Sequence, residues 1–327
     1  MHPFAYLASG SVPDAVAHAA RRPHAVFIAG GTDLLQLLQE RVEAPSEVID
    51  INRLPLQGIE TDGEALRIRA LVTLADAAAH PAIRDRFPAI AEALEETASP
   101  QVRNMATVAG NLLQRTRCLY FRDNTTPCNK RTPGAGCSAM DGVNRMNAVL
   151  GVSDHCIAAH PSDLAVALLA LDARLRLHGP DGSRDMAVAD LHREPGDRPD
   201  LETNLRRGEL ITEIVVPSGG LARRSCYVKV RDRAAFEWAL VSAAAAIEVE
   251  DGVIRRAGIA AGGVGTKPWR LEGVAAELVG KPPTPETLRT AAERAGEGAR
   301  PRPGNAFKVE LLKRTVARAL MTAGVRA

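Results

Sequence analysis

Residues 101–173 read QVRNMATVAGNLLQRTRCLYFRDNTTPCNKRTPGAGCSAMDGVNRMNAVLGVSDHCIAAHPSDLAVALLALDA, and the rest of the chain is organised around this stretch. It holds four of the five cysteines: Cys118, Cys128, Cys137 and Cys156. Residues 115–157 show almost no apolar periodicity, over a length far above that of an ordinary connection between two elements. Four thiolates bound to one inorganic centre would supply the order that such a loop lacks. The stretch therefore predicts a metal or iron–sulfur site.

The spacing of the four cysteines does not identify the centre. There is no CxxC pair, so the signature of a zinc ribbon is absent. The residues between the cysteines are mainly Gly, Pro, Asn, Thr and Arg, whereas a free structural cysteine normally lies in an apolar run. The fifth cysteine, Cys226, lies in such a run and is expected to be a buried thiol. All-cysteine ligation suits both a [4Fe–4S] cluster and Zn²⁺.

A pair of glycines follows a predicted buried strand near the N-terminus, in Gly30, Gly31, Thr32 and Asp33. Consecutive glycines let backbone amides turn towards one point, which is how a pyrophosphate is held without a lysine. The pattern is neither GxGxxG nor a phosphate loop with GK[ST]. The alternative is an ordinary tight turn, with Asp33 as a helix cap, and the local sequence alone favours this alternative.

Three further places carry polar groups suited to a nucleotide. In TVAGN (107–111), Thr107 and Asn111 are possible donors and Gly110 permits close approach. Asp163 is a possible acceptor for a ribose hydroxyl, or simply part of a helix N-terminus. Lys229 and Arg231 lie on one face of a predicted strand, where they meet either a cofactor or solvent.

Composition excludes several classes of protein. The chain has 327 residues, of which 46% are hydrophobic and only 3% aromatic, so Ala, Val and Leu must fill a large core. The net charge of +2, without a basic stripe, argues against a nucleic-acid binder. Residues 1–12 lack the basic and apolar regions of an export signal, and no window is apolar enough for a membrane span. Metal ligands or buried thiols then suit the five cysteines better than disulfides.

Apolar patterning predicts mixed α and β structure in two parts that meet at Gly219 and Gly220. The second part, of roughly a hundred residues, is expected to be a three-stranded meander followed by helices. Strands are expected at 4–9, 26–29, 46–51, 59–68 (a hairpin), 173–178, 208–217, 225–231, 239–250 and 254–261, and the main helices from Ser11, from Thr73, and at 88–96, 163–171, 271–279, 285–295 and 306–323.

Five motifs, in this order, resemble those of the FAD-binding subunits of molybdenum hydroxylases: FIAGGTDL (27–34), TVAGN (107–111), PSDL (161–164), ELITEI (209–214) and YVKVR (227–231). The resemblance covers nearly the whole chain. The cysteine-rich insert is similar to that of the flavin subunits of bacterial periplasmic aldehyde oxidoreductases, which carries a [4Fe–4S] cluster. One departure is Ala109, where many relatives have glycine.

The resemblance implies an α+β fold, namely the two-subdomain FAD-binding fold of the p-cresol methylhydroxylase type with a small α+β C-terminal domain. The domains would be 1–218, including the iron–sulfur insert 115–157, and 222–327. It also implies which residues contact FAD: Phe27, Ile28, Ala29, Gly30, Gly31, Thr32, Asp33, Leu34, Leu35, Thr107, Gly110, Asn111, Gln114, Asp163, Ile211 and Lys229. Lys229 would approach the flavin ring, and Cys118, Cys128, Cys137 and Cys156 would hold the cluster.

The same resemblance implies an oxidoreductase that does not hydroxylate a substrate by itself. A molybdenum-cofactor large subunit would oxidise an aldehyde, and a small subunit with [2Fe–2S] clusters would pass electrons to FAD and on to an external acceptor. Without a leader of its own, the chain would be periplasmic by co-export with a partner, or cytoplasmic. One alternative is a zinc-stabilised nucleotide-binding protein without redox function. Another, an independent NAD-linked dehydrogenase, is disfavoured because GxGxxG is missing.

Overall fold

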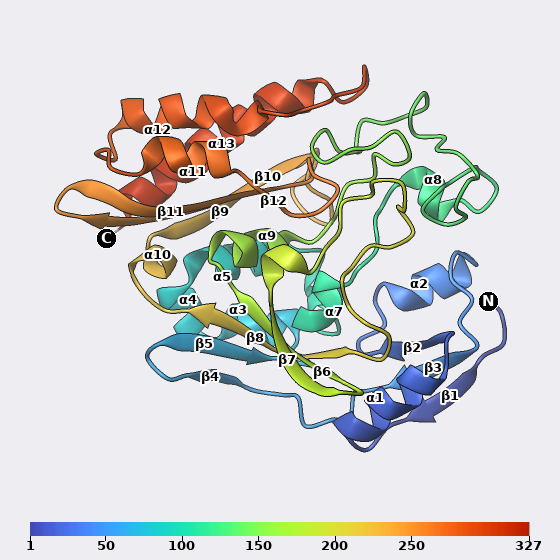
Figure 1. Ribbon diagram of the computed structural model, residues 1–327. Helices are drawn as coiled ribbons and strands as arrows, with labels where there is room; N and C mark the ends of the chain where they lie inside the picture. Colours follow the sequence, from blue (N-terminus) through green and yellow to red (C-terminus); the bar gives the residue numbers. More distant parts are fainter. Residues whose placement is uncertain (327) are drawn as a thin grey trace.

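Three β-sheets and the helices between them make up the computed structural model, which describes residues 1–326 (Figure 1). The first sheet is parallel, in the order β1-β3-β2, with strands β1 (Ala5–Ala8), β2 (Ala25–Ile28) and β3 (Glu47–Asp50). Helices α1 (Val12–Arg21) and α2 (Leu34–Gln39) connect these strands, as parallel pairing requires. The Ser11 hydroxyl caps α1 by accepting from the Asp14 amide at 3.2 Å, as the sequence predicts.

The second sheet has five strands in the order β4-β5-β8-β6-β7, and all of its pairs are antiparallel. The predicted hairpin with a turn at 62–63 is present, and Asp62 Oδ1 accepts from the amides of Glu64 and Ala65. The strands are β4 (Ile59–Thr61), β5 (Ala65–Arg69), β6 (Arg174–Gly179), β7 (Gly182–Ala187) and β8 (Leu210–Pro217).

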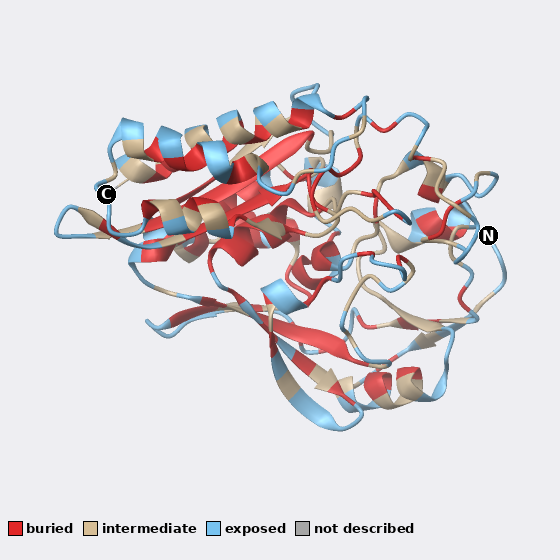
Figure 2. Cartoon of the chain, turned by 45° about the horizontal axis from the view of Figure 1, so that its top comes forward, coloured by how far each residue is buried: buried red, intermediate tan, exposed pale blue. Residues whose placement is uncertain are grey.

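Short helices fill the space between this sheet and the C-terminal part. Every residue of α9 (Asp163–Ala170) is buried, because the helix packs against α5 on one side and against β10 and β11 on the other. Figure 2 shows this buried centre in red. The other helices of the region are α3 (Leu74–Ala79), α4 (Pro81–Arg86), α5 (Pro88–Glu95), α6 (Pro100–Arg103), α7 (Val108–Leu112) and the 3₁₀ turn η1 (Val188–Asp190).

The C-terminal sheet has four antiparallel strands, not the three that the sequence predicts. They are β9 (Ser225–Val230), β10 (Val241–Glu250), β11 (Val253–Gly262) and β12 (Trp269–Arg270), in the order β12-β11-β10-β9. The missed strand β12 has only two residues, too few for alternation to appear in the sequence. The sheet shares one core with α11 (Glu272–Leu278), α12 (Pro285–Ala292), η2 (Glu293–Gly296) and α13 (Phe307–Val325). The buried residues of α10 (Gly220–Arg223) belong instead to the larger apolar core of the molecule.

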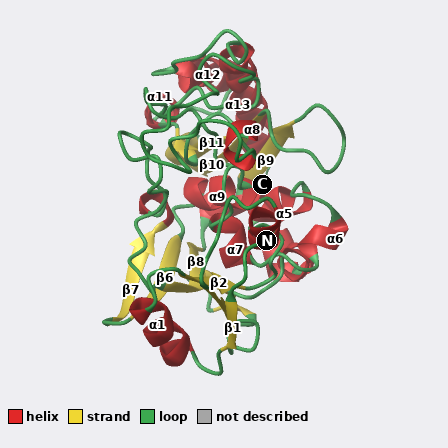
Figure 3. Ribbon diagram, turned by 90° about the vertical axis from the view of Figure 1, so that its right-hand side faces the viewer, coloured by secondary structure: helices red, strands yellow, loops and turns green. Residues whose placement is uncertain are grey.

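The cysteine-rich insert is almost entirely loop, as the sequence predicts, with one short helix, α8 (Leu119–Arg122). Figure 3 shows these loops around α8, between the N-terminal strands and the C-terminal helices. Their own apolar cluster is small: Phe121 and Cys128 pack with Leu37 of α2. None of the helices within residues 1–326 combines the length and hydrophobicity that a membrane crossing needs.

Candidate functional site

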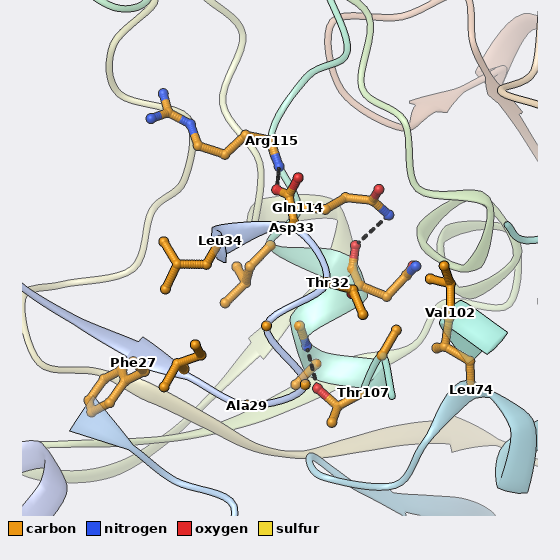
Figure 4. Close-up of a pocket in the computed structure, with 18 of the residues that line it drawn as sticks. Phe27, Ala29, Thr32, Asp33, Leu34, Leu74, Val102, Thr107, Gln114 and Arg115 are labelled. Carbon is orange, nitrogen blue, oxygen red and sulfur yellow. Dashed lines mark hydrogen bonds between the residues drawn. The ribbon is translucent and has the colours of Figure 1, made fainter. Parts of the chain in front are cut away.

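A cavity of about 520 Å³ opens where β2 ends, between the turn at 30–33, helix α7 and the start of β8 (Figure 4). This volume lies within the range of ordinary ligand sites. Three stretches that are distant in the sequence meet here, at 26–34, 106–115 and 209–211. Most of the residues that the sequence predicts for a dinucleotide line it: Phe27, Ile28, Ala29, Gly30, Gly31, Thr32, Asp33, Leu34, Thr107, Gly110, Asn111, Gln114 and Ile211.

The glycine turn is shaped by its neighbours and leaves its amides unused. A Cβ on Gly30 would lie 1.8 Å from the Met105 carbonyl oxygen, so the two turns approach too closely for any side chain. Gly31 has φ +69°, which favours glycine. None of the N–H groups of residues 30–33 donates to a protein acceptor within residues 1–326. Free amides that face a cavity can donate to a ligand, so this turn fits an anionic group such as a pyrophosphate.

Asp33 does not cap α2, so the simpler of the two interpretations is wrong for this residue. Its carboxylate reaches the insert, where it accepts from the Arg115 amide at 2.8 Å and pairs with Arg122 at 2.7 Å (Figure 4 shows the first contact). Arg117 pairs with the same carboxylate at 2.9 Å. Three insert residues therefore converge on one side chain of the glycine turn.

The second predicted turn, TVAGN (107–111), is the short helix α7, capped by Thr107, whose Oγ1 accepts from the Gly110 amide at 3.2 Å. The amides of residues 108 and 109 donate to carbonyls of residues 72 and 70, so they are not free for a ligand. Asn111 Oδ1 accepts from Ser162 Oγ at 2.6 Å, and Gln114 Nε2 donates to the Asn111 carbonyl at 3.0 Å. This segment thus forms a wall of the cavity and braces it, while the glycine turn provides the free donors.

Asp163 and Lys229 do not line this cavity. They form a buried ion pair between α9 and β9. Lys229 Nζ lies 2.7 Å from Asp163 Oδ2, and the two side chains are 1% and 4% exposed. The Tyr227 hydroxyl donates to Asp163 Oδ1 at 2.5 Å. Burial, and next to it the negative charge of Asp163, raises the Tyr227 pKa well above its usual value. The interpretation of Lys229 as part of a solvated strand face is wrong.

A second cavity, of about 410 Å³, adjoins the first and is lined by Asp163. Arg117 and Trp238 line both cavities, and the Arg117 guanidinium lies 4.4 Å from the centre of the Trp238 ring. Burial lowers the Arg117 pKa to about 10. The sequence analysis missed both residues, since neither lies in a motif, although Arg117 directly precedes a predicted cluster ligand. Leu35 lines neither cavity and is exposed.

All four insert cysteines line one small enclosed cavity. Cys128 and Cys137 face each other as an isolated antiparallel bridge. Burial raises the pKa of the Cys156 thiol to about 12, and burial together with the neighbouring Cys118 and Cys128 raises that of Cys137. Amide groups already face the sulfurs: Asn147 Nδ2 lies 3.5 Å from Cys118 Sγ, and the Ala158 amide 3.4 Å from Cys156 Sγ.

The four thiols are not arranged to bind a single ion. No group of three or more His, Cys, Asp or Glu side chains in residues 1–326 has the geometry of a site for one metal ion. Ligands of a cluster bind separate iron atoms and lie further apart than ligands of one ion. The cavity between the thiols has a volume of about 10 Å³, which is about the size that holds one water molecule. Cys226 is fully buried elsewhere and donates to the Ala319 carbonyl, as predicted.

Comparison with known proteins gives matches along the whole chain. Residues 2–219 match the FAD binding domain in molybdopterin dehydrogenase, and residues 226–325 match the CO dehydrogenase flavoprotein C-terminal domain. The chain is 46% identical to the aldehyde oxidoreductase FAD-binding subunit PaoB of Escherichia coli (strain K12), over 100% of both chains. It is 28% identical to the carbon monoxide dehydrogenase medium chain of Hydrogenophaga pseudoflava, over 99% of this chain and 98% of that one.

Solved structures share the fold. A chain of the Cu,Mo-CO dehydrogenase superimposes with a TM-score of 0.78 at 23% identity, covering 100% of this chain and 99% of that one. A chain of the carbon monoxide dehydrogenase from Hydrogenophaga pseudoflava gives a TM-score of 0.75 at 26% identity, covering 98% and 96%.

Proposed function

The chain belongs to the FAD-binding subunits of molybdenum hydroxylases, as the flavin subunit of an oxidoreductase of the aldehyde oxidoreductase type, and on this basis we propose that it also carries a [4Fe–4S] cluster and passes electrons to an external acceptor. The single observation that carries the proposal is the gathering of Cys118, Cys128, Cys137 and Cys156 around one cavity. The extents of the two family matches support a division into domains 1–218 and 222–327.

We place the dinucleotide in the 520 Å³ cavity. The free amides of residues 30–33 would hold its pyrophosphate, and Thr107, Gly110, Asn111, Gln114 and Ile211 would form the walls. When bound, FAD supplies the two-electron chemistry, while the protein binds and orients it. Asp163 lines the adjoining cavity, and we assign it to the same ligand. Lys229 and Tyr227 then act through Asp163, by fixing the position and charge of its carboxylate.

We assign the cluster to the four insert cysteines. All-thiolate ligation, enclosure and amide groups directed at the sulfurs are features of [4Fe–4S] sites. When bound, the cluster supplies one-electron transfer.

The electrons would come from partner subunits. We propose a molybdenum-cofactor large subunit that oxidises the aldehyde and a [2Fe–2S] small subunit that relays the electrons to FAD. The name of the PaoB relative, a FAD-binding subunit of an aldehyde oxidoreductase, supports this proposal. The expected observation is that the chain purifies with both partners and that the isolated chain oxidises no aldehyde. Aldehyde oxidation by the isolated chain would contradict the proposal.

A visible absorption spectrum with iron, zinc and flavin analysis of the purified complex tests the cofactors. Flavin bands, together with iron beyond that of the [2Fe–2S] subunit, are expected, and acid precipitation should release FAD into the supernatant. The same iron and flavin measurements on the isolated chain show whether the additional iron is bound by this subunit. Zinc in place of iron would support the alternative, and FMN or a yellow pellet would contradict the FAD assignment.

A further inference from the structure

One of the four cysteines differs from the others in its surroundings. Cys118 lines the cysteine cavity and also the 410 Å³ cavity that Asp163 lines. Within residues 1–326, Cys128, Cys137 and Cys156 line the first of these cavities but not the second. Of the four cysteines, Cys118 is therefore the one that lies between the cysteine cavity and the cavity lined by Asp163.

A buried amide covers this sulfur. Asn147 is 4% exposed, and its Nδ2 lies 3.5 Å from Cys118 Sγ. A thiolate accepts hydrogen bonds and cannot donate them, so the side chain must present its N–H to a bound sulfur. Asn147 also lines the 410 Å³ cavity, which puts it beside the route between the two cofactors.

The position of Asn147 is fixed from behind by the C-terminal domain. Its backbone carbonyl accepts from Lys308 Nζ at 3.0 Å and from Asn305 Nδ2 at 3.3 Å. Lys308 is fully buried, donates also to the Gly263 carbonyl at 2.8 Å, and has no carboxylate partner within residues 1–326. A buried lysine and a buried asparagine thus hold the backbone carbonyl of the residue whose side chain contacts Cys118.

Building on the cluster assignment above, we propose that Asn147 is a positioning residue that sets the reduction potential of the iron–sulfur centre through an N–H···S hydrogen bond to Cys118. Hydrogen bonds to cluster sulfurs are among the factors that set the potential. A donor stabilises the reduced cluster more than the oxidised one, because the reduced cluster carries more negative charge. Asn147 therefore raises the potential and favours electrons residing on the cluster rather than on the flavin.

The test is a redox titration of the complete complex, followed by electron paramagnetic resonance at low temperature, where a [4Fe–4S] signal is separated from [2Fe–2S] signals by its faster relaxation. Asn147→Leu keeps the side-chain size and removes the donor. We expect a shift of the [4Fe–4S] potential to more negative values, with the ratio of iron to flavin unchanged. Asn147→Ala, which removes the same donor without adding a charge, should shift it in the same direction and decides the matter if the leucine variant does not assemble.

Asn144→Leu is the matched control. Asn144 is as buried as Asn147 and belongs to the same insert, but its Nδ2 donates to the backbone carbonyls of Ala139 and Met140 and contacts no sulfur. The [4Fe–4S] potential of the Asn144→Leu complex should equal that of the wild type. An unshifted potential in an iron-replete Asn147 variant, or an equal shift in the control, overturns the inference. A wild-type complex with no iron on this subunit instead overturns the cluster assignment itself.

Discussion

The glycine turn and the cysteine insert lie against each other but owe their order to different forces. The turn at 30–33 leaves a sheet that packs into the large apolar core, and its geometry is set by close approach to residue 105. The insert has only a small apolar cluster, and hydrogen bonds to its backbone carbonyls help to hold it, such as those that Arg131 donates to Tyr120 and Phe121. A nucleotide site can therefore be built by the fold, whereas we expect the insert to depend on its proposed inorganic centre for rigidity.

The two regions are nevertheless less separate than composition suggests. The sequence predicts that the insert can lose its centre while the flavin site stays intact. The carboxylate of Asp33 joins them, because it binds Arg115, Arg117 and Arg122 of the insert. Four experiments break or sharpen this comparison, beginning with the largest effect.

Removing one ligand of the proposed cluster should abolish iron binding and disorder the insert, with a smaller effect on the flavin site. Cys137→Ser is expected to lose the [4Fe–4S] iron completely and to make residues 115–157 sensitive to protease, while flavin stays at least partly bound. Iron per flavin and limited proteolysis measure both effects. Cys226→Ser is the control, since its thiol lies in the C-terminal core, and it should keep all iron. Iron loss in Cys226→Ser with iron retained in Cys137→Ser would reverse the ligand assignment.

Breaking the buried ion pair should destabilise the flavin-binding region strongly. Lys229→Met leaves the Asp163 carboxylate buried without its cation, at a cost of about 3–5 kcal/mol in the free energy of unfolding. Chemical denaturation of the flavin-binding subunit measures the loss. Lys313→Met, which removes an exposed partner of Glu293, is the control and should cost about 0–1 kcal/mol. An equal loss of unfolding free energy in the two variants would contradict a stabilising role for the buried charge of Lys229.

Removing the charge of Asp33, which joins the glycine turn to the insert, should weaken flavin binding and iron binding together. Asp33→Asn leaves Arg117 and Arg122 without their shared carboxylate, and we expect a loss of about 1–3 kcal/mol, since the side chains are only partly buried. Flavin affinity and iron content, measured on one preparation, should fall in parallel. Asp123→Asn is the control, because that carboxylate accepts only from Thr125. A loss of one cofactor with the other unchanged would mean that the regions are independent.

The last experiment concerns a pH dependence that arises at Lys308 of α13, which donates to the Asn147 carbonyl of the insert. Burial, and to a lesser degree Arg145, lowers the Lys308 pKa from 10.5 to about 7, so folding releases a proton between these values. The unfolded chain then binds more protons, and stability should rise with pH from about 7 to 9, by up to about 1.4 kcal/mol per unit. Denaturation midpoints across this range should show the slope in the wild type and a reduced slope in Lys308→Met. Identical slopes in the wild type and in Lys308→Met would show that Lys308 does not cause the change in stability between pH 7 and 9.

Several features followed from the sequence because local chemistry determines them. The glycine pair at 30 and 31, the hairpin between the strands expected at 239–250 and 254–261, and the buried thiol of Cys226 are each decided by neighbouring residues. The order of the motifs was likewise enough to identify the family. Short elements were missed, as with β12, where two residues show no periodicity.

Only the tertiary structure decided which polar groups meet. Asp33 was expected either to cap a helix or to contact FAD, and its carboxylate binds Arg115, Arg117 and Arg122, which lie about eighty to ninety residues further along the chain. Lys229 was expected either beside a cofactor or in water, and its charge is neutralised by Asp163. Such pairings depend on which loops the packed core brings together, and the energy of a buried charge depends on everything around it. A local pattern holds neither piece of information, so the sequence predicted the candidate residues and the fold assigned their partners.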